Sequence, residues 1–316
     1  MVNKKIKNFF IDNKKILMRL LKFIFAAAIL FFLIDYLSIN KIIFMLSKAD
    51  LKIVSLSFLL ILLNIFLQFK RWELLCTEVL KEKHKYTILK SVFYGISSGL
   101  ITPFRIGEFF GRAFTFKGEN FHKAVSLSIL DRFLSLFVTL VLGGIAFIFF
   151  SKKYFNIAEF TLFITVISFI LILVLLITIT YFGLIKPKKI KFLQKIINYF
   201  SIIKNVKLNI LTRLVLFSVL FFITYVAQFA LLISAFAGIE NIMVYFLIGV
   251  LVFFTNTIIP PFTFGELGIR ESAAIFFSKV YGVQAVVGFN SSIILFLFNL
   301  LIPSIIGLII YIKDEK

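Results

Sequence analysis

Two short segments of the chain carry the same set of charged and turn-forming residues. Residues 101–112 read ITPFRIGEFFGR and residues 259–270 read IPPFTFGELGIR, so at an offset of 158 they agree at six of twelve positions. In each segment a glutamate precedes an arginine by four residues, which puts both on one face of a helix where they can pair. The predicted pairs are Glu108 with Arg112 and Glu266 with Arg270. A glutamate could orient each arginine for a phosphate, which the planar guanidinium binds in bidentate fashion.

Further charges accompany these pairs within or beside apolar stretches. Each charge at membrane depth costs about 2.5–3.5 kcal/mol on insertion scales unless it is paired or hydrated. Several of them in two matching places predict a polar cavity there. The alternative is a set of internal salt bridges that pin the helices without touching a substrate. The candidate residues for a lipid head group are Arg105, Glu108, Arg112, Asp131, Arg132, Glu266, Arg270 and Glu271.

Prolines and glycines shape the same two segments. Proline disfavours helix in the residue before it and starts a new helix well, and glycine lets two helix backbones approach closely in lipid. We therefore expect a helical hairpin at each segment. The residues expected to build these hairpins are Pro103, Gly107, Pro260, Pro261, Gly265 and Gly268.

The composition places these hairpins in a membrane. Of 316 residues, 61% are hydrophobic and 16% are charged, against about 45–50% and about 25% in soluble domains. In this setting the net charge of +20 indicates topology-determining lysines and contacts with anionic lipids, and not a nucleic-acid partner. One cysteine and two histidines argue against a zinc site. We expect no cofactor.

Six apolar stretches are long enough to span the bilayer, which takes about 20 residues; they are 20–37, 53–69, 124–150, 160–184, 214–236 and 283–312. Two more apolar stretches, 86–102 and 241–259, end at prolines. Each could cross the membrane fully, form a short buried helix, or enter the membrane and return to the same side. The basic stretch 185–213 has eight Lys or Arg and no acid. The positive-inside rule favours a cytoplasmic location for this basic stretch. It lies in the cytoplasm only if 86–102 is a re-entrant hairpin that does not cross the membrane.

The predicted fold is an all-α polytopic membrane protein with about six full transmembrane helices and two re-entrant helical hairpins in an inverted-repeat arrangement. We expect a single integral membrane domain over 1–316, with repeat 1 at about 52–150 and repeat 2 at about 214–312. A basic amphipathic linker, 185–213, would lie in the head-group region. Opposite entry sides imply a pseudo-two-fold axis in the membrane plane, as in many transporters. The location expected is the cell membrane, with both termini cytoplasmic. Trp72 is expected to anchor a helix end at the interface.

These segments resemble one known family. The run YGISSGLITPFRIGE at 94–108, the pair Asp131-Arg132 and the stretch 261–271 are similar to the lysylphosphatidylglycerol synthase transmembrane-region family, the flippase-like domain of multiple peptide resistance factor proteins. The resemblance extends over about residues 15–312. It implies a membrane protein that handles a phosphate-bearing, possibly aminoacylated, lipid. The residues that match the family's motifs are Pro103, Arg105, Gly107 and Glu108 in the first segment and Gly265, Gly268, Arg270 and Glu271 in the second.

One residue departs from the family pattern, because many relatives have glycine where this chain has Glu266. The favoured function is a lipid flippase or transporter whose partners are membrane lipids, with an anionic or lipid-phosphate substrate. The alternative is a membrane-embedded transferase or accessory subunit acting on polyprenyl-phosphate-linked sugars. That chemistry would use Glu108, Asp131, Glu266 and Glu271 as bases or metal ligands, but the expected aspartate-rich motifs are missing. A homo-oligomer or a partner enzyme is compatible with either function.

Overall fold

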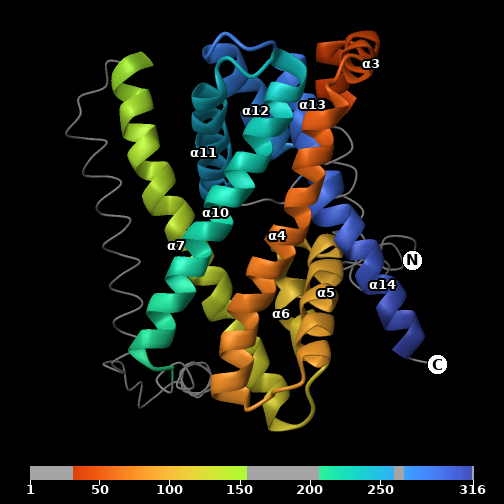
Figure 1. The fold of residues 1–316 in the computed structure, drawn as a ribbon, viewed down its shortest axis with the longest axis vertical. Coiled ribbons are helices and arrows are strands. Elements are labelled where there is room, and N and C mark those ends of the chain that lie inside the picture. The colour runs from red at the N-terminus through yellow and green to blue at the C-terminus, as the bar shows by residue number, and fades with distance from the viewer. Residues whose placement is uncertain (1–30, 155–205, 260–266, 315–316) are drawn as a thin grey trace, which may run out of the picture.

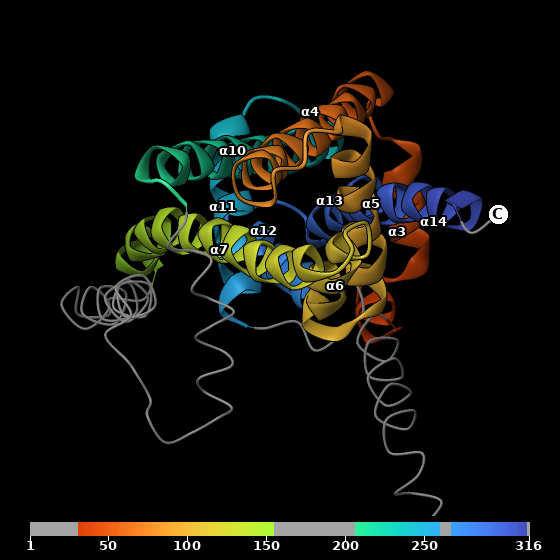
Figure 2. The same cartoon turned by 90° about the horizontal axis from the view of Figure 1, so that it is seen from below.

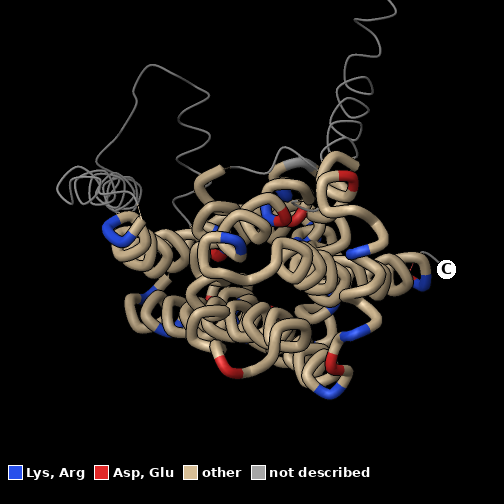
Figure 3. Tube along the Cα trace, turned by 90° about the horizontal axis from the view of Figure 1, so that it is seen from above, with Lys and Arg blue, Asp and Glu red and all other residues tan. Residues whose placement is uncertain are grey.

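The computed structural model describes residues 31–154, 206–259 and 267–314, and within these ranges every regular element is helical. Seen from one end, most of the described chain carries neither sign of charge (Figure 3). Large apolar side chains point outward along the long helices; Leu62, Phe149 and Leu216 are each more than half exposed. Outward-facing apolar side chains suit a lipid environment, since the bilayer core solvates them.

Four helices are long and apolar enough to cross a membrane within the described residues. They are α4 with a π-helical continuation (Leu51–Leu80), α7 (Glu119–Tyr154), α10 (Leu208–Ala237) and the rod formed by α13 and α14 (Ala285–Asp314). The shortest has 30 residues, about 45 Å at 1.5 Å per residue, against a hydrocarbon core of about 30 Å. These helices make the chain an integral membrane protein.

The four helices confirm the predicted apolar spans 53–69, 124–150, 214–236 and 283–312. The predicted span 160–184 lies outside the described residues, as do most of 20–37 and of the linker 185–213. Residues 31–37 are helical. The individual bounds are α3 at Ile39–Ser47, α4 at Leu51–Leu75, a π-helix at Cys76–Leu80, α13 at Ala285–Phe296, a π-helix at Leu297–Leu301 and α14 at Ile302–Asp314.

Two helix pairs lie where prolines interrupt the apolar stretches of the sequence. The first is α5 (Lys85–Ile101) and α6 (Ile106–Ala113), and the second is α11 (Ile242–Ile258) and α12 (Ile269–Val280). Both α5 and α11 have 17 residues, fewer than the roughly 20 that span a bilayer. The two pairs lie in opposite halves of the molecule along its longest axis (Figure 1).

The first pair is closed by a strained turn. Phe104 and Arg105 adopt left-handed backbone angles, with φ of 56° and 53°, which costs a non-glycine residue roughly 1–2 kcal/mol. Thr102 stabilises the turn, because its Oγ1 accepts a hydrogen bond from the Gly107 N–H at 2.7 Å and donates to the carbonyl of Ser98 at 2.9 Å. The turn reverses the chain, so α6 packs back along α5.

Glycine is needed where α6 meets α5. A Cβ added to Gly107 would lie 2.3 Å from the Ser98 carbonyl oxygen, and one added to Gly111 would lie 1.9 Å from Ser98 Oγ. Neither position has room for a methyl group, so the two helices approach closely at Gly107 and Gly111. Of the other predicted hairpin residues, Gly268 is the N-cap of α12 with φ of 97°, and Pro260, Pro261 and Gly265 lie outside the described residues.

The remaining packing arranges the helices in layers. Seen along the longest axis, α4 and α10 lie side by side on one face and α7 on the other, with α11, α12 and α13 between them (Figure 2). One apolar cluster joins α7, α10, α11, α12 and α13, and a second joins α4, α5, α7 and the start of α10. The polar groups described next lie among these elements.

Candidate functional site: a cationic cavity between the helices

A cavity of about 300 Å³ lies between the first helix pair and the long helices, and it is lined by charged, hydroxyl-bearing, amide and aromatic side chains. Its charged residues are Arg71, Arg105, Glu108, Arg112, Asp131 and Arg132. Its hydroxyl and amide residues are Gln68, Ser135, Thr139, Ser218, Tyr225, Asn256, Thr257 and Asn299. Phe104, Phe109, Phe221, Phe222 and Phe253 supply the aromatic part of the wall.

The charged side chains form an alternating chain of ion pairs. Arg71 Nη2 lies 2.5 Å from Asp131 Oδ1, and Arg112 Nη1 lies 2.8 Å from Asp131 Oδ2. Arg112 Nη2 continues to Glu108 Oε1 at 2.8 Å, and Arg105 Nη2 ends the chain 3.2 Å from Glu108 Oε2. Each carboxylate therefore joins two guanidinium groups. The ion pair expected between Glu108 and Arg112 is present.

This chain of ion pairs is buried. Arg71, Glu108, Arg112 and Asp131 are each at most 4% exposed. Arg132 also lines the cavity, and all four guanidinium groups are close enough to interact electrostatically with the Glu108 carboxylate. Four arginines therefore gather in one cavity, and guanidinium groups are suited to bind an anion such as a phosphate.

Local structure positions each member of the chain. Glu108 lies in the first turn of α6, where the helix dipole favours a negative charge, and Arg112 lies in the last turn. The indole ring of Trp72 lies 5.1 Å below the Arg112 guanidinium, and its Nε1 donates to Ser91 Oγ at 2.9 Å. Trp72 is fully buried. Its expected role as an interfacial anchor is therefore wrong, because the ring packs under an arginine inside the protein.

Sequence reasoning missed Arg71 as a site residue. It lies beyond the apolar stretch 53–69, next to Lys70, and belongs to neither of the two repeated segments. In the structure α4 continues to Leu75, and Arg71 Nη2 also donates to the carbonyl oxygen of Asp131 at 2.7 Å. The only signal was an arginine two residues past a span. Its partner lies 60 residues away in sequence, which no local pattern indicates.

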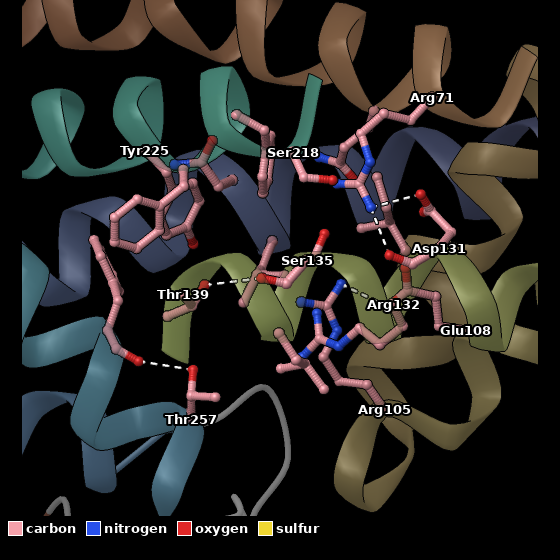
Figure 4. Close-up of a pocket in the computed structure, with 18 of the residues that line it drawn as sticks. Arg71, Arg105, Glu108, Asp131, Arg132, Ser135, Thr139, Ser218, Tyr225 and Thr257 are labelled. Atoms are coloured by element: carbon pink, nitrogen blue, oxygen red, sulfur yellow. Dashed lines mark hydrogen bonds and ion pairs between the residues drawn. The ribbon is translucent and has the colours of Figure 1, made fainter. Parts of the chain in front are cut away.

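The opposite side of the cavity is neutral and polar. Figure 4 shows Thr139, Tyr225 and Thr257 on one side, and Arg71, Asp131 and Glu108 on the other. Thr139 and Thr257 donate to carbonyl oxygens of their own helices, at 3.1 Å and 2.8 Å. The cavity thus has a cationic side and a hydroxyl-lined side.

The second charged cluster does not join this cavity. Arg270 Nη2 pairs with Glu271 Oε1 at 2.8 Å, and Arg270 Nε donates to Ser292 Oγ at 2.9 Å. The other carboxylate oxygen of Glu271 accepts from the Gly268 N–H at 2.6 Å. Both charged residues are at most 1% exposed, and neither lines the cavity. The expected partner Glu266 lies outside the described residues.

The two clusters differ because the two short helices begin at different points of the shared motif. Arg112 lies in the last turn of α6, where it reaches α7. The helix α12 begins only at Ile269, so Arg270 lies in its first turn and contacts α13. Arg270 and Glu271 therefore do not line the cavity that Glu108 and Arg112 line.

A third polar group connects the long helices. Asn64 Nδ2 donates to Gln228 Oε1 at 2.7 Å and to Asn299 Oδ1 at 3.1 Å, and Asn299 Nδ2 donates to Gln228 Oε1 at 2.8 Å. All three carboxamides are buried, and Asn299 also lines the cavity from a π-helical turn. Such turns occur often at functional sites. The sequence signal was the presence of amide side chains within three apolar spans.

The comparisons with known proteins agree with the architecture. No curated protein matches the chain. The family described as lysylphosphatidylglycerol synthase TM region matches residues 19–307, which is nearly the whole chain. Together with the span-length helices, this match connects the protein to lipid handling in a membrane. The chain belongs to the lysylphosphatidylglycerol synthase TM-region family.

Proposed function

We propose that the protein binds the phosphate-bearing head group of a membrane lipid in the cationic cavity and carries it between the two leaflets. The observation that carries this proposal is the gathering of four arginines in a cavity inside a bundle with apolar outer faces. Guanidinium groups bind phosphate through paired, charge-assisted hydrogen bonds. The Nε atoms of Arg71 and Arg112 are buried and, among the described residues, make no hydrogen bond.

The size of the cavity supports movement of the head group alone. Its volume of about 300 Å³ lies at the lower end of the range of ligand pockets, about 300–1,000 Å³. A lipid phosphate with a small substituent fits such a space, and two acyl chains do not. The chains would therefore stay in the bilayer while the head group passes through the protein.

The proposed transport path uses the two helix pairs as re-entrant hairpins of an inverted repeat, 52–150 and 214–312. Their 17-residue first helices, their shared motif and their places in opposite halves of the molecule support this (Figure 1). In transporters of this kind, substrate sites lie between discontinuous helices near the bilayer midplane.

The proposed orientation puts the N- and C-termini on the cytoplasmic side of the cell membrane. Lysines gather where α4 ends, where α5 and α10 begin, and where α14 ends. They include Lys81, Lys83, Lys85, Lys207 and Lys313. By the positive-inside rule, this end faces the cytoplasm. The first hairpin then enters from the cytoplasmic side and the second from the outside.

The test is reconstitution of the full chain into liposomes with a leaflet-resolved assay of labelled anionic phospholipids. Arg105→Gln and Arg132→Gln each remove one cavity charge and should slow movement at least tenfold. The matched control is Arg213→Gln, because Arg213 is exposed on α10 and does not line the cavity. Size-exclusion profiles and thermal unfolding in detergent report whether the variants fold. Unchanged rates in both folded cavity variants would reject the proposed role.

A further inference from the structure

The rod formed by α13 and α14 touches both helix pairs. Its first half, α13, packs along α12 of the second pair, and its second half, α14, packs along α5 of the first pair (Figure 1). Ser292 Oγ on α13 donates to Glu271 Oε1 on α12 at 3.0 Å. Ser97 Oγ on α5 donates to the carbonyl oxygen of Ser304 on α14 at 2.8 Å. One helical element therefore joins the two pairs.

The two contacts of the rod are built alike. A Cβ added to Gly288 on α13 would lie 2.5 Å from the carbonyl oxygen of Ala274, and one added to Gly307 on α14 would lie 2.5 Å from the carbonyl oxygen of Phe93. In both cases the hydroxyl of the serine one turn further along the facing helix lies against the same glycine. Backbones packed this closely have little room to slide past each other. Each half of the rod is therefore expected to move with the helix it touches.

Between these two contacts the rod changes its hydrogen-bond pattern. A π-helical turn at Leu297–Leu301 separates α13 from α14, and Pro303 lies two residues beyond it. Proline has no N–H, so Pro303 cannot donate to the carbonyl oxygen of Asn299 four residues earlier, and its ring crowds that carbonyl group. Prolines and π-bulges are the usual places where long helices kink. The rod therefore bends most easily between the two helix pairs.

This bending point lies at the wall of the cavity. Asn299, inside the π-helical turn, lines the cavity, and its carboxamide is hydrogen-bonded to Asn64 on α4 and to Gln228 on α10. These bonds join neutral groups, which makes them weaker than the charge-assisted bonds nearby. A bend in the rod would thus move the cavity wall and change the spacing of the two helix pairs together.

We infer that the α13–α14 rod is a hinge that couples the two helix pairs, and that Pro303 allows it to bend at the cavity. The second pair and α13 form one moving body, and the first pair and α14 form the other. The inference rests on the proposed function, because the bend would expose the cavity to one leaflet after the other.

The first experiment uses Pro303→Ala in the full chain, with acyl-labelled phosphatidylglycerol in liposomes. Alanine restores the missing N–H and favours a helix far more than proline does, so the rod should stiffen. We expect lipid movement to slow about tenfold, which corresponds to a barrier about 1.4 kcal/mol higher, while the thermal midpoint in detergent does not fall. The control is Ile305→Ala, because Ile305 is exposed on the same helix; it should move lipid at the unmodified rate.

The outcomes of this experiment separate the inference from the proposed function. If the unmodified chain moves lipid and Pro303→Ala moves it equally fast, the inference is wrong and the proposed function stands. A variant that is slower and also less stable would overturn the inference too, because proline would then serve the fold and not the bending. If the unmodified chain moves lipid no faster than protein-free liposomes, the proposed function itself fails.

The second experiment measures the bending directly. In a Cys76→Ala background, spin labels at Tyr86→Cys on α5 and Phe276→Cys on α12 report the distance between the two pairs by pulsed electron paramagnetic resonance. All the labelled positions are exposed. We expect a broad distance distribution that narrows when Pro303→Ala is added. The matched control pairs Tyr86→Cys with Ile312→Cys on α14, within one moving body, and should be narrow in both proteins. An α5–α12 distribution that Pro303→Ala leaves unchanged would contradict the hinge.

Discussion

The two helix pairs start from one sequence motif and reach different structures. In the first pair, Glu108 and Arg112 join a network that spans α4, α6 and α7 and lines a cavity. In the second, Arg270 pairs with its sequence neighbour Glu271 and with Ser292, and neither charged residue lines that cavity. A buried charge pair can therefore line a ligand site or hold helices together. The cavity beside the first pair distinguishes the two.

The largest expected effect tests whether the ion pair of Arg270 with Glu271 stabilises the fold. Glu271→Ala leaves Arg270 buried without its carboxylate, which should lower the free energy of unfolding by about 3–5 kcal/mol. The double variant Arg270→Met with Glu271→Ala removes both charges and should recover most of that loss, since apolar replacement of a whole buried pair is often neutral. Denaturant unfolding in detergent measures both. A double variant as unstable as the single one would mean that the cluster does more than neutralise itself.

The same double replacement in the first pair sharpens the contrast. Arg112→Met with Glu108→Leu removes a matched pair of charges, and we expect the folded protein to lose lipid movement. If the folded variant still moved lipid, the pair of Glu108 with Arg112 would have only a structural role, and the proposed difference between the two pairs would be wrong.

A smaller effect is expected where α6 touches α5. Gly107→Ala puts a Cβ 2.3 Å from the Ser98 carbonyl oxygen, a backbone atom that cannot move alone. Overpacking of this kind costs about 1–3 kcal/mol. The matched control is Gly99→Ala, whose Cβ would lie 3.2 Å from the Cβ of Glu108, a contact that a shift of a few tenths of an ångström relieves. Thermal unfolding should separate the two variants, and equal midpoints would show that the pair is loosely packed.

The smallest effect concerns the carboxamides that connect the long helices outside both pairs. Asn64→Leu removes the hydrogen bonds to Gln228 and Asn299, and interhelical bonds in membranes contribute about 0.6–2 kcal/mol. We expect a loss of stability in that range. Asn241→Leu, at the exposed start of α11, is the control. A loss no larger than in that control would show that the carboxamides contribute little to helix association.

Local patterns account for the parts of the structure that the sequence predicted. Four long apolar stretches are span-length helices, both proline breaks end helices, and Glu108 pairs with Arg112 one turn away. Gly107 was predicted from the same reasoning, since close helix contacts need small residues. Each of these features depends on residues within a few turns of each other.

The missed features depend on packing between distant segments. Asp131 bridges Arg71 and Arg112 across 60 and 19 residues of sequence. The carboxamides of Asn64 and Asn299 meet across 235 residues. The predicted pair of Glu266 with Arg270 stays a prediction, because Glu266 lies outside the described residues. The i, i+4 rule assumes a helix through both positions, and α12 begins only one residue before the arginine.

The small volume of the cavity has a consequence for substrate tolerance under the proposed function. Because only the head group enters about 300 Å³ of protein space, the fatty acids never meet the binding residues. Chain length, unsaturation and branching would then have little influence on turnover. A bacterium or other cell that remodels its fatty acids with temperature would keep the same carrier working without any change in this protein.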